Sequence, residues 1–250
     1  MICVVVPTYN EASTLPILLD ALLALPDEYE VLVVDDASPD GTAEIALAMR
    51  RVCNRVHVIL REGGRGYGLA SKEGLRWALD RGYRIACTID GDLTHDPSAM
   101  PRLVACVDDG ADAAIGSRFA PGGGYEPGFP LSRRMLTRSG NAYARLMMRA
   151  RARDNTSGYR CYTADALRRV NLDSIRSDGY FFLIELICAL RDRGARIDEV
   201  PIRYATRAKG VSKISIPLVA EAFGRVTALG FEEHFGSARP PIAEPKEETR

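Results

Sequence analysis

The sequence contains no run of about 18 consecutive apolar residues, so it predicts no membrane-spanning helix. Its six cysteines form no Cys-x-x-Cys pair, which favours small buried thiols in a reducing cytosol over disulfides. No basic segment precedes the first apolar run, so we expect no signal peptide. The formal net charge is zero, with 33 basic and 33 acidic residues. No global field therefore indicates a nucleic-acid partner.

What is present is ordinary for a globular protein. The 250 residues are 46% hydrophobic and 26% charged, which is enough for one sizeable core. The even charge balance hides a local surplus, because Ser117 to Val170 holds eleven arginines against three acidic residues. That surplus predicts an anionic partner for this face. The last stretch, 231–250, is rich in proline and charge, and we expect a loose tail there.

The first half of the chain alternates short β-branched runs with helical spacing of leucine and isoleucine. Strands are expected at 2–7, 30–36, 55–60, 84–90 and 112–117. Strands that alternate with helices and read as nearly continuous apolar runs predict an α/β fold, with a mostly parallel sheet covered on both faces. Beyond Gly116 the pattern changes to a Gly/Pro loop, an Arg-rich amphipathic helix at 131–150, and an apolar helix at 181–191.

Three polar clusters follow expected strands: "PTYNE" at 7–11, "DDASPDGT" at 35–42 and "DGDLTH" at 90–95. Each alone is compatible with turn chemistry, and Ser38 or Asp40 is suited to cap the next helix. In open α/β sheets, however, ligands bind beyond the carboxyl ends of the strands. The convergence of three clusters on one sheet edge therefore indicates a binding site.

Asp90, Gly91 and Asp92 favour a metal–diphosphate site. Two carboxylates two residues apart can reach one hard cation such as Mg²⁺ or Mn²⁺, and substrate phosphates take its other positions. The cation also removes the repulsion between closely packed carboxylates. His95 is either a further ligand or a donor to phosphate, whereas Asp96, before a proline, is expected to cap a helix.

Eight segments follow one another along the chain: "VVVPTYNE", "VVDDASPDGT", "IDGDLTHDP", "IGSRF", "RSGN", "DNTSGYRCY", "GYFFLIE" and "EVPIRYATRAKGVSKI". In this order they resemble family 2 glycosyltransferases, and specifically polyprenol-phosphate (dolichol-phosphate) mannose synthases. The resemblance covers about residues 2–230 and implies a GT-A (Rossmann-like) nucleotide-sugar-binding fold. It also implies one domain, with a nucleotide-binding half at 1–116 and an acceptor-binding half at 117–230.

The resemblance also implies roles for individual residues. The positions that match nucleotide-binding residues are Pro7, Tyr9, Glu11 and Asp36. Asp90 and Asp92 match the metal and diphosphate site. The positions that match acceptor-phosphate and loop-closing residues are Arg118, Arg133, Thr137, Arg207 and Lys213.

Two departures from the family concern the substrates rather than the reaction. The family often has Lys-Leu-Gly-Leu-Gly where this chain has residues 64–68, Gly-Arg-Gly-Tyr-Gly, and Arg65 is placed to replace the lysine's charge. Leu183 stands where a glutamine is common. No Ser-His-Asp or Cys-His arrangement is present. Glu185 is either a base or a structural carboxylate that pairs with Arg160.

The arginine stripe of the helix at 131–150 has two interpretations. It is either an ordinary surface helix over the sheet or a helix that lies at an anionic membrane surface. The apolar segment at 214–230 either adds a weaker membrane contact or packs in the core.

The expected activity is inverting transfer of mannose from GDP-mannose to polyprenyl phosphate with a divalent metal. The alternatives keep the fold and use UDP-glucose, UDP-GlcNAc or a soluble acceptor. We expect a cytoplasmic protein, peripheral at the inner face of the membrane, with or without an anchoring partner, and no nucleic-acid ligand. A dehydrogenase would need Gly-x-Gly-x-x-Gly after the first strand, where this chain has "PTYNEA". A nucleic-acid binder is disfavoured by the neutral net charge.

Overall fold

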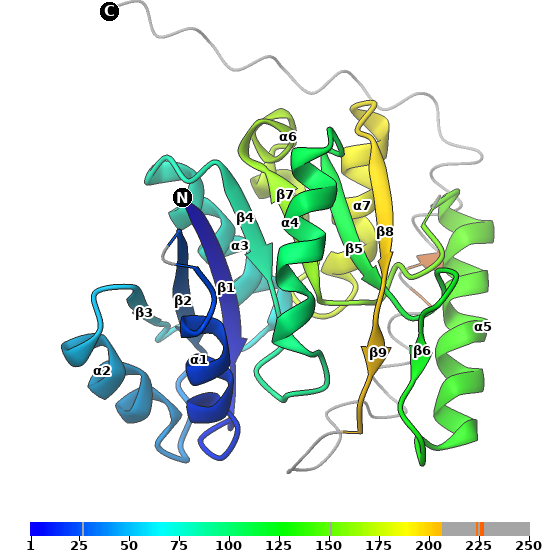
Figure 1. Cartoon of the computed structure of the whole chain (residues 1–250). Coiled ribbons are helices and arrows are strands. Elements are labelled where there is room, and N and C mark those ends of the chain that lie inside the picture. The colour runs from blue at the N-terminus through cyan, green and yellow to red at the C-terminus, as the bar shows by residue number, and fades with distance from the viewer. Residues whose placement is uncertain (27, 151, 207–223, 225, 228–250) are drawn as a thin grey trace, which may run out of the picture.

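The central sheet has seven strands in the order β3-β2-β1-β4-β7-β5-β8 (Figure 1). The computed structural model describes residues 1–26, 28–150, 152–206, 224, 226 and 227. The strands of this sheet are β1 (Ile2–Thr8), β2 (Tyr29–Asp35), β3 (Val56–Leu60), β4 (Ile85–Thr88), β5 (Ala113–Ser117), β7 (Arg160–Thr163) and β8 (Ile197–Pro201). All neighbours are parallel except β7, which is antiparallel to β4 and β5. The predicted α/β fold with a mostly parallel sheet is confirmed.

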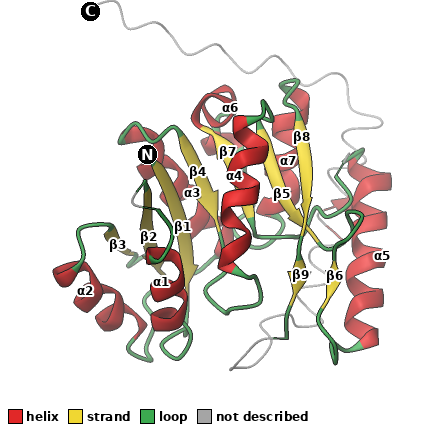
Figure 2. Ribbon diagram, in the orientation of Figure 1, coloured by secondary structure: helices red, strands yellow, loops and turns green. Residues whose placement is uncertain are grey.

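Helices cover both faces of the sheet (Figure 2). One face carries α1 (Leu15–Leu23), α2 (Thr42–Val52) and α4 (Met100–Asp108). The other carries α3 (Tyr67–Asp80), α6 (Ala164–Arg169) and α7 (Phe182–Asp192). The period of two along a strand explains the division, because Val4 and Val6 of β1 face the first layer while Cys3 and Val5 face the second.

The five strands expected in the first half are present, and the expected helices at 131–150 and 181–191 correspond to α5 (Leu131–Met148) and α7. Strand β7 was not anticipated, since its four residues, Arg-Cys-Tyr-Thr, are not an apolar run. It is a strand because it fills the gap between β4 and β5. There Arg160 is fully buried and donates to the carbonyls of Ser157, Leu183 and Asn155 at 2.6–2.7 Å.

The strand order reverses at β1. The chain continues from β1 to β2 and β3 on one side, whereas β4 pairs with the other side of β1. The loops that leave the carboxyl ends of β1 and β4 therefore diverge and open a crevice. The two loops, at 9–14 and 89–96, begin next to each other because β1 and β4 are neighbours in the sheet.

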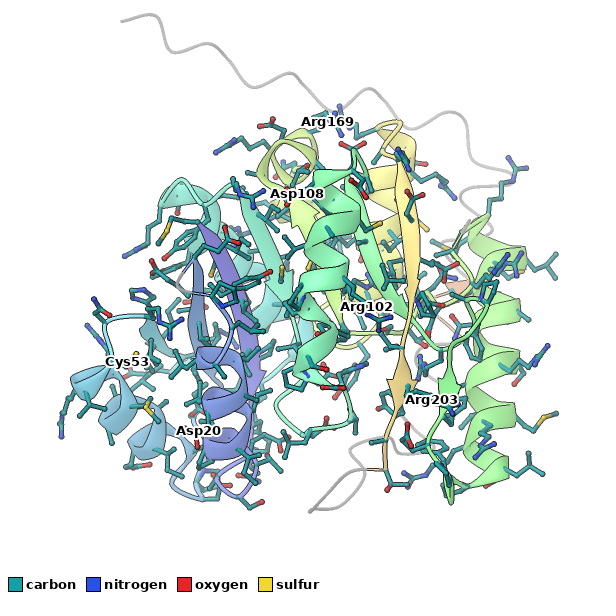
Figure 3. All side chains as sticks on the ribbon, viewed as in Figure 1. Asp20, Cys53, Arg102, Asp108, Arg169 and Arg203 are labelled. Carbon is teal, nitrogen blue, oxygen red and sulfur yellow. The ribbon has the colours of Figure 1, made fainter. Side chains whose placement is uncertain are left out.

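A small two-stranded sheet, β6 (Gly124–Tyr125) with β9 (Arg203–Tyr204), stands beside the main sheet. The backbone of His95 bridges to Tyr204. Arg102 of α4 donates to the Pro201 carbonyl at 3.0 Å, which fastens α4 to the end of β8 (Figure 3). Two short 3₁₀ helices, η1 (Pro97–Ala99) and η2 (Leu172–Ser174), complete the elements that the structure describes. The division into two functional halves stays a prediction, and the expected tail at 231–250 lies outside the described residues.

Candidate active site

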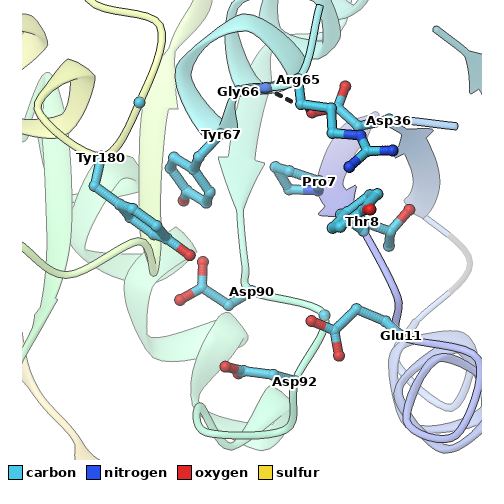
Figure 4. Close-up of a pocket in the computed structure, with 13 residues that line it drawn as sticks. Pro7, Thr8, Glu11, Asp36, Arg65, Gly66, Tyr67, Asp90, Asp92 and Tyr180 are labelled. Atoms are coloured by element: carbon cyan, nitrogen blue, oxygen red, sulfur yellow. Dashed lines mark hydrogen bonds between the residues drawn. The ribbon is translucent and has the colours of Figure 1, made fainter. Parts of the chain in front are cut away.

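A pocket of about 290 Å³ opens where β1, β2 and β4 end (Figure 4). Every residue that the resemblance assigns to the nucleotide or the metal lines it: Pro7, Tyr9, Glu11, Asp36, Asp90 and Asp92. The remaining lining residues come from the loop before α3, from the Asp90–Asp92 turn, from β1 and from the loop before α7: Thr8, Arg65, Gly66, Tyr67, Gly91, Gly179 and Tyr180. Segments separated by more than a hundred residues thus meet in one site.

Asp36 forms one end of the pocket. Its carboxylate pairs with Arg61, and its Oδ2 accepts from the Gly66 backbone N–H at 2.9 Å. Arg61 is held in turn by Glu73 at 2.7 Å. Next to this group the guanidinium of Arg65 lies 4.3 Å from the centroid of the Tyr9 ring, a cation–π contact. This end therefore offers a carboxylate acceptor beside a cation and an aromatic ring.

The other polar residues of "DDASPDGT" shape the loop after β1. Asp35 accepts from Thr8 Oγ1 at 2.8 Å, and Ser38 Oγ accepts from the Asn10 N–H at 3.0 Å. Asp40 accepts from the Ala12 N–H at 3.0 Å and from Thr42. Part of this cluster therefore stabilises turns, which is one of the two interpretations of the sequence. The same contacts hold the loop that carries Glu11.

The opposite end of the pocket is the turn at 90–95. Asp92 is 4% exposed, and its Oδ1 accepts from the Thr94 N–H at 3.1 Å and from the Thr94 hydroxyl at 2.6 Å. His95 Nε2 lies 3.5 Å from Asp90 Oδ2, which makes His95 a neighbour of that carboxylate. Leu93, at φ 59°, is one of three non-glycine residues with positive φ in the site loops. Such strain concentrates at functional sites.

The acids of this turn fit a divalent cation. Within the described part of the chain, no group of three or more His, Cys, Asp or Glu side chains is arranged to hold a metal. Mg²⁺, however, is commonly held by one or two carboxylates while substrate phosphates and water complete its shell. Asp90 and Asp92 supply two hard oxygen ligands on a pocket wall, so they suit a cation that arrives with a diphosphate. Asp96 caps η1, accepting from the Ser98 N–H at 2.9 Å as predicted.

The third wall, Tyr67 and Tyr180, was missed in the sequence. Their rings stack with centroids 4.7 Å apart and an interplanar angle of 15°. The wall could have been suspected from residues 64–68, because Gly66 and Gly68 permit a close backbone approach. A Cβ on Gly66 would lie 2.3 Å from the Asp178 carbonyl oxygen, and one on Gly68 would lie 2.7 Å from the Ser177 carbonyl oxygen.

Arg118 does not line the pocket. It is 8% exposed, and Nε and Nη2 donate to the two oxygens of Asp154 at 2.7 and 2.6 Å. Desolvation lowers the pKa of Arg118, but the charge of Asp154 and these hydrogen bonds outweigh it and raise the pKa. No described residue accepts from Nη1. The guanidinium also lies 4.9 Å from the centroid of the Tyr204 ring, beside the strand that bridges to His95.

The residues predicted on the amphipathic helix divide between surface and interior. Arg133 is exposed, and its carbonyl accepts from Thr137 Oγ1 at 2.9 Å. The adjacent Arg134 instead turns inward, with its guanidinium 5.4 Å from the centroid of the Tyr125 ring. The Arg118 guanidinium lies 6.0 Å from the same ring. Arg207 and Lys213, predicted to close over the site, lie outside the described residues.

Glu185 does not pair with Arg160, so that expectation was wrong. The carboxylate of Glu185 accepts from the backbone N–H groups of Arg176 and Ser177, each at 3.1 Å. The partners of Arg160 are the three backbone carbonyls given above. Glu185 therefore secures the loop that leads to Tyr180.

Comparison with known proteins agrees with this geometry. Residues 3–175 match the sequence pattern of glycosyl transferase family 2. The chain is 42% identical over 235 residues to the undecaprenyl-phosphate mannosyltransferase of Micrococcus luteus, covering 94% of this chain and 96% of that protein. It is 38% identical over 238 residues to the polyprenol monophosphomannose synthase of Mycolicibacterium smegmatis, covering 94% of this chain and 89% of that protein.

A solved structure shows the same fold. Glucosyl-3-phosphoglycerate synthase from Mycobacterium tuberculosis, in complex with Mn²⁺, uridine diphosphate and glucosyl-3-phosphoglycerate, matches with a TM-score of 0.67 over 93% of this chain and 79% of that one. At 22% identity this likeness concerns the fold alone. Among the described residues, no helix is both long and apolar enough to cross a bilayer. With the family pattern spanning most of the chain, the protein is a GT-A-fold glycosyltransferase that belongs to glycosyl transferase family 2.

Proposed function

We propose that the protein transfers mannose from GDP-mannose to the phosphate of a polyprenyl phosphate, with inversion at the anomeric carbon. The observation that carries this proposal is the single pocket with Asp36 at one end and the Asp90–Asp92 turn at the other. A nucleoside diphosphate sugar needs hydrogen bonds and stacking at its base and charge compensation at its diphosphate. The names of the two relatives, which both contain a polyprenyl phosphate and mannose, support the choice of sugar and acceptor.

The chemistry needs no protein base. The second pKa of a phosphate monoester is about 6, so at neutral pH the acceptor is already an anion. Its oxygen attacks the anomeric carbon as the bond from that carbon to the diphosphate breaks, and the diphosphate leaves with the bonding electrons. A Mg²⁺ or Mn²⁺ ion at Asp90 and Asp92 would supply positive charge to the departing diphosphate.

The acceptor must be held in line although it is repelled by the donor diphosphate. Fixed positive charges oppose this repulsion, and we assign this task to Arg118 with the arginines of α5. Arg118 is rigid because Asp154 holds it by two hydrogen bonds, which leaves Nη1 to meet an anion. We assign Arg133 and Thr137, together with Arg207 and Lys213, to the same task, and Arg134 joins them because it faces the same aromatic ring as Arg118.

The test is transfer of radiolabel from each of several nucleotide sugars into an organic phase that contains polyprenyl phosphate. We expect label from GDP-mannose, in an amount that falls to background in excess EDTA and in Asp92→Asn. Label from UDP-glucose or UDP-GlcNAc instead would replace the donor in this proposal. Transfer only to a water-soluble acceptor would replace the acceptor, and full activity in EDTA would remove the metal.

The acceptor suggests a protein that is peripheral on the cytoplasmic face of the membrane, with α5 as the contact. Four large apolar side chains of α5 are exposed: Leu131 at 72%, Met135 at 61%, Leu136 at 43% and Leu146 at 72%. They accompany Arg138 and Arg145, which suit anionic headgroups. Membrane contact through this face of α5 is compatible with an anchoring partner but does not require one.

Flotation with vesicles that contain anionic lipid tests this membrane contact. The double variant Met135→Glu/Leu146→Glu should float several-fold less than the wild type, because it places two charges where the apolar face enters the lipid. The control is Val52→Glu, at a valine that is 81% exposed on α2, and it should float like the wild type. Equal flotation of all three proteins would contradict the contact through α5.

A further inference from the structure

The hydroxyl of Tyr67 is a buried polar group that the proposed reaction has not used. This oxygen is buried and has no hydrogen-bond partner, although the residue itself is only partly buried and lines the donor pocket. An unpaired buried hydroxyl costs free energy, so its retention calls for a partner that the protein alone does not supply. The partner must be a ligand of the pocket into which the hydroxyl points.

The backbone fixes this hydroxyl at one point. Tyr67 is the first residue of α3, and the N–H of the next residue, Gly68, donates to the Asp178 carbonyl at 2.7 Å. On its other side the Gly66 N–H donates to Asp36. The ring stacks on Tyr180. Tyr67 is therefore braced on both sides, and a rigid group of this kind is suited to reading a ligand.

The nearest charged group is Asp90. The hydroxyls of Tyr67 and Tyr180 both point toward the Asp90 carboxylate (Figure 4). A Cβ on Gly158 would lie 2.5 Å from Tyr67 Oη and also 2.5 Å from Asp90 Oδ1, so the two oxygens are separated by no more than twice that distance. Gly158 is itself held in place, because its carbonyl accepts from Thr88 Oγ1 at 2.7 Å. The missing side chain of Gly158 permits this approach.

A donor beside a carboxylate has a defined chemical preference. A hydroxyl can donate to the Asp90 carboxylate and accept from the phenol at once, whereas an ionised phosphate oxygen has no proton to donate. The ordinary pKa of a tyrosine is about 10, so the phenol is a hydrogen-bond donor at neutral pH. The Tyr67 phenol and the Asp90 carboxylate together therefore suit a hydroxyl group of the sugar.

We propose that Tyr67, together with Asp90, binds one hydroxyl of the donor hexose and so determines which sugar is accepted. This inference rests on the proposed donor, a nucleotide sugar, and adds the residue that reads its sugar. The hydroxyl is a feature of this chain, since the family often carries leucine at this position.

The test is Tyr67→Phe, which keeps the ring and its stacking on Tyr180 and removes one oxygen. Calorimetry should show an unchanged Kd for GDP and a Kd for GDP-mannose that rises about 10- to 100-fold. Monodeoxy GDP-mannose analogues then identify the hydroxyl. The wild type should bind one of these analogues about 10- to 100-fold more weakly than it binds GDP-mannose. Tyr67→Phe should bind that analogue and GDP-mannose about equally, because the hydroxyl removed from the ligand and the oxygen removed from the protein are partners.

Two controls separate this result from damage to the fold. Tyr83→Phe also removes a buried hydroxyl, one that bonds Glu30 at 2.6 Å beyond the far end of β4, and it should leave both Kd values unchanged. Melting temperatures of both variants monitor the fold. An equal rise of both Kd values in Tyr67→Phe, or unchanged binding of GDP-mannose, would overturn the inference and leave the proposed function standing. A wild type that binds no nucleotide sugar would overturn both.

Discussion

Asp36 is the residue on which the nucleotide end of the pocket and the loop before α3 both depend. It is 6% exposed, pairs with Arg61 and accepts the Gly66 N–H. Because Gly66 directly precedes Tyr67, the carboxylate that we assign to the nucleotide also positions the aromatic wall. Its substitution should therefore affect the donor more than the acceptor.

Asp36→Asn should weaken nucleotide affinity by about 1–3 kcal/mol, since an amide cannot replace a carboxylate that accepts on both oxygens. Calorimetry with GDP measures the loss. The control is Glu73→Gln, which releases the other partner of Arg61 outside the pocket and should change the affinity little. Equal effects of the two variants would mean that Asp36 acts only by holding Arg61.

Arg118 is both a structural residue and a candidate ligand of the acceptor. Its removal leaves Asp154, which is 0% exposed, as an unpaired buried charge. Such a loss costs about 3–5 kcal/mol of stability. A loss of activity in an Arg118 variant can therefore result from lost stability alone. A variant of Asp154, which breaks the same ion pair but keeps the arginine, is needed for comparison.

Arg118→Gln and Asp154→Asn form that comparison. Both should lower the melting temperature, but only Arg118→Gln removes the cation, so it alone should raise the KM for polyprenyl phosphate about tenfold or more. Steady-state kinetics at a temperature where both variants are folded provides the measurement. Similar KM values in the two variants would reduce Arg118 to a structural role.

At the scale of elements, the donor pocket depends on how closely α3 lies on the sheet. Gly74, in the middle of α3, faces β1, and a Cβ there would lie 2.3 Å from Val5 Cγ1. Glycine inside a helix costs about 1 kcal/mol relative to alanine. The close contact between α3 and β1 outweighs this cost, because it leaves no room for the methyl group of alanine. The same contact holds α3, whose first turn borders the pocket, against the sheet.

Gly74→Ala should therefore destabilise the protein by about 1–3 kcal/mol although it improves helix propensity, because the added methyl overpacks the interface. Gly140→Ala is the matched control. Gly140 lies inside α5 with nothing within 4 Å of its Cβ position, so alanine there should stabilise by up to about 1 kcal/mol. Urea denaturation measures both changes. A stable Gly74→Ala protein would show that α3 can lift from β1 without cost.

At the scale of the whole molecule, the pocket brings together parts that are distant in the chain. The pocket takes residues from β1, from the loop after β2, from the loops that follow β3 and β4, and from the segment before α7. A ligand that binds all of them stabilises the folded state by mass action. The metal and the nucleotide should stabilise together, because the diphosphate completes the shell of the cation.

Thermal unfolding of the wild type should show a larger increase of Tm with GDP plus Mn²⁺ than the sum of the increases with each alone. At 100 times its Kd a ligand adds about 2.7 kcal/mol, which is a shift of several degrees. Asp92→Asn should retain the increase with GDP alone and lose the extra increase with metal. An unaltered metal effect in that variant would place the cation elsewhere.

The sequence alone determined the α/β class, the five strands of the first half and the polar clusters at the strand ends, because these depend on local periodicity and on the rule that ligands bind at carboxyl ends. Proximity in the fold decided the rest. Arg160 makes a strand of an unremarkable segment only because β4 and β5 leave a gap for it. Arg118 pairs with Asp154, and Arg134 rather than Arg133 turns inward, because side-chain direction depends on the neighbours that packing provides. Tyr67 faces Asp90 across Gly158, and no spacing along the chain encodes that meeting of three distant segments.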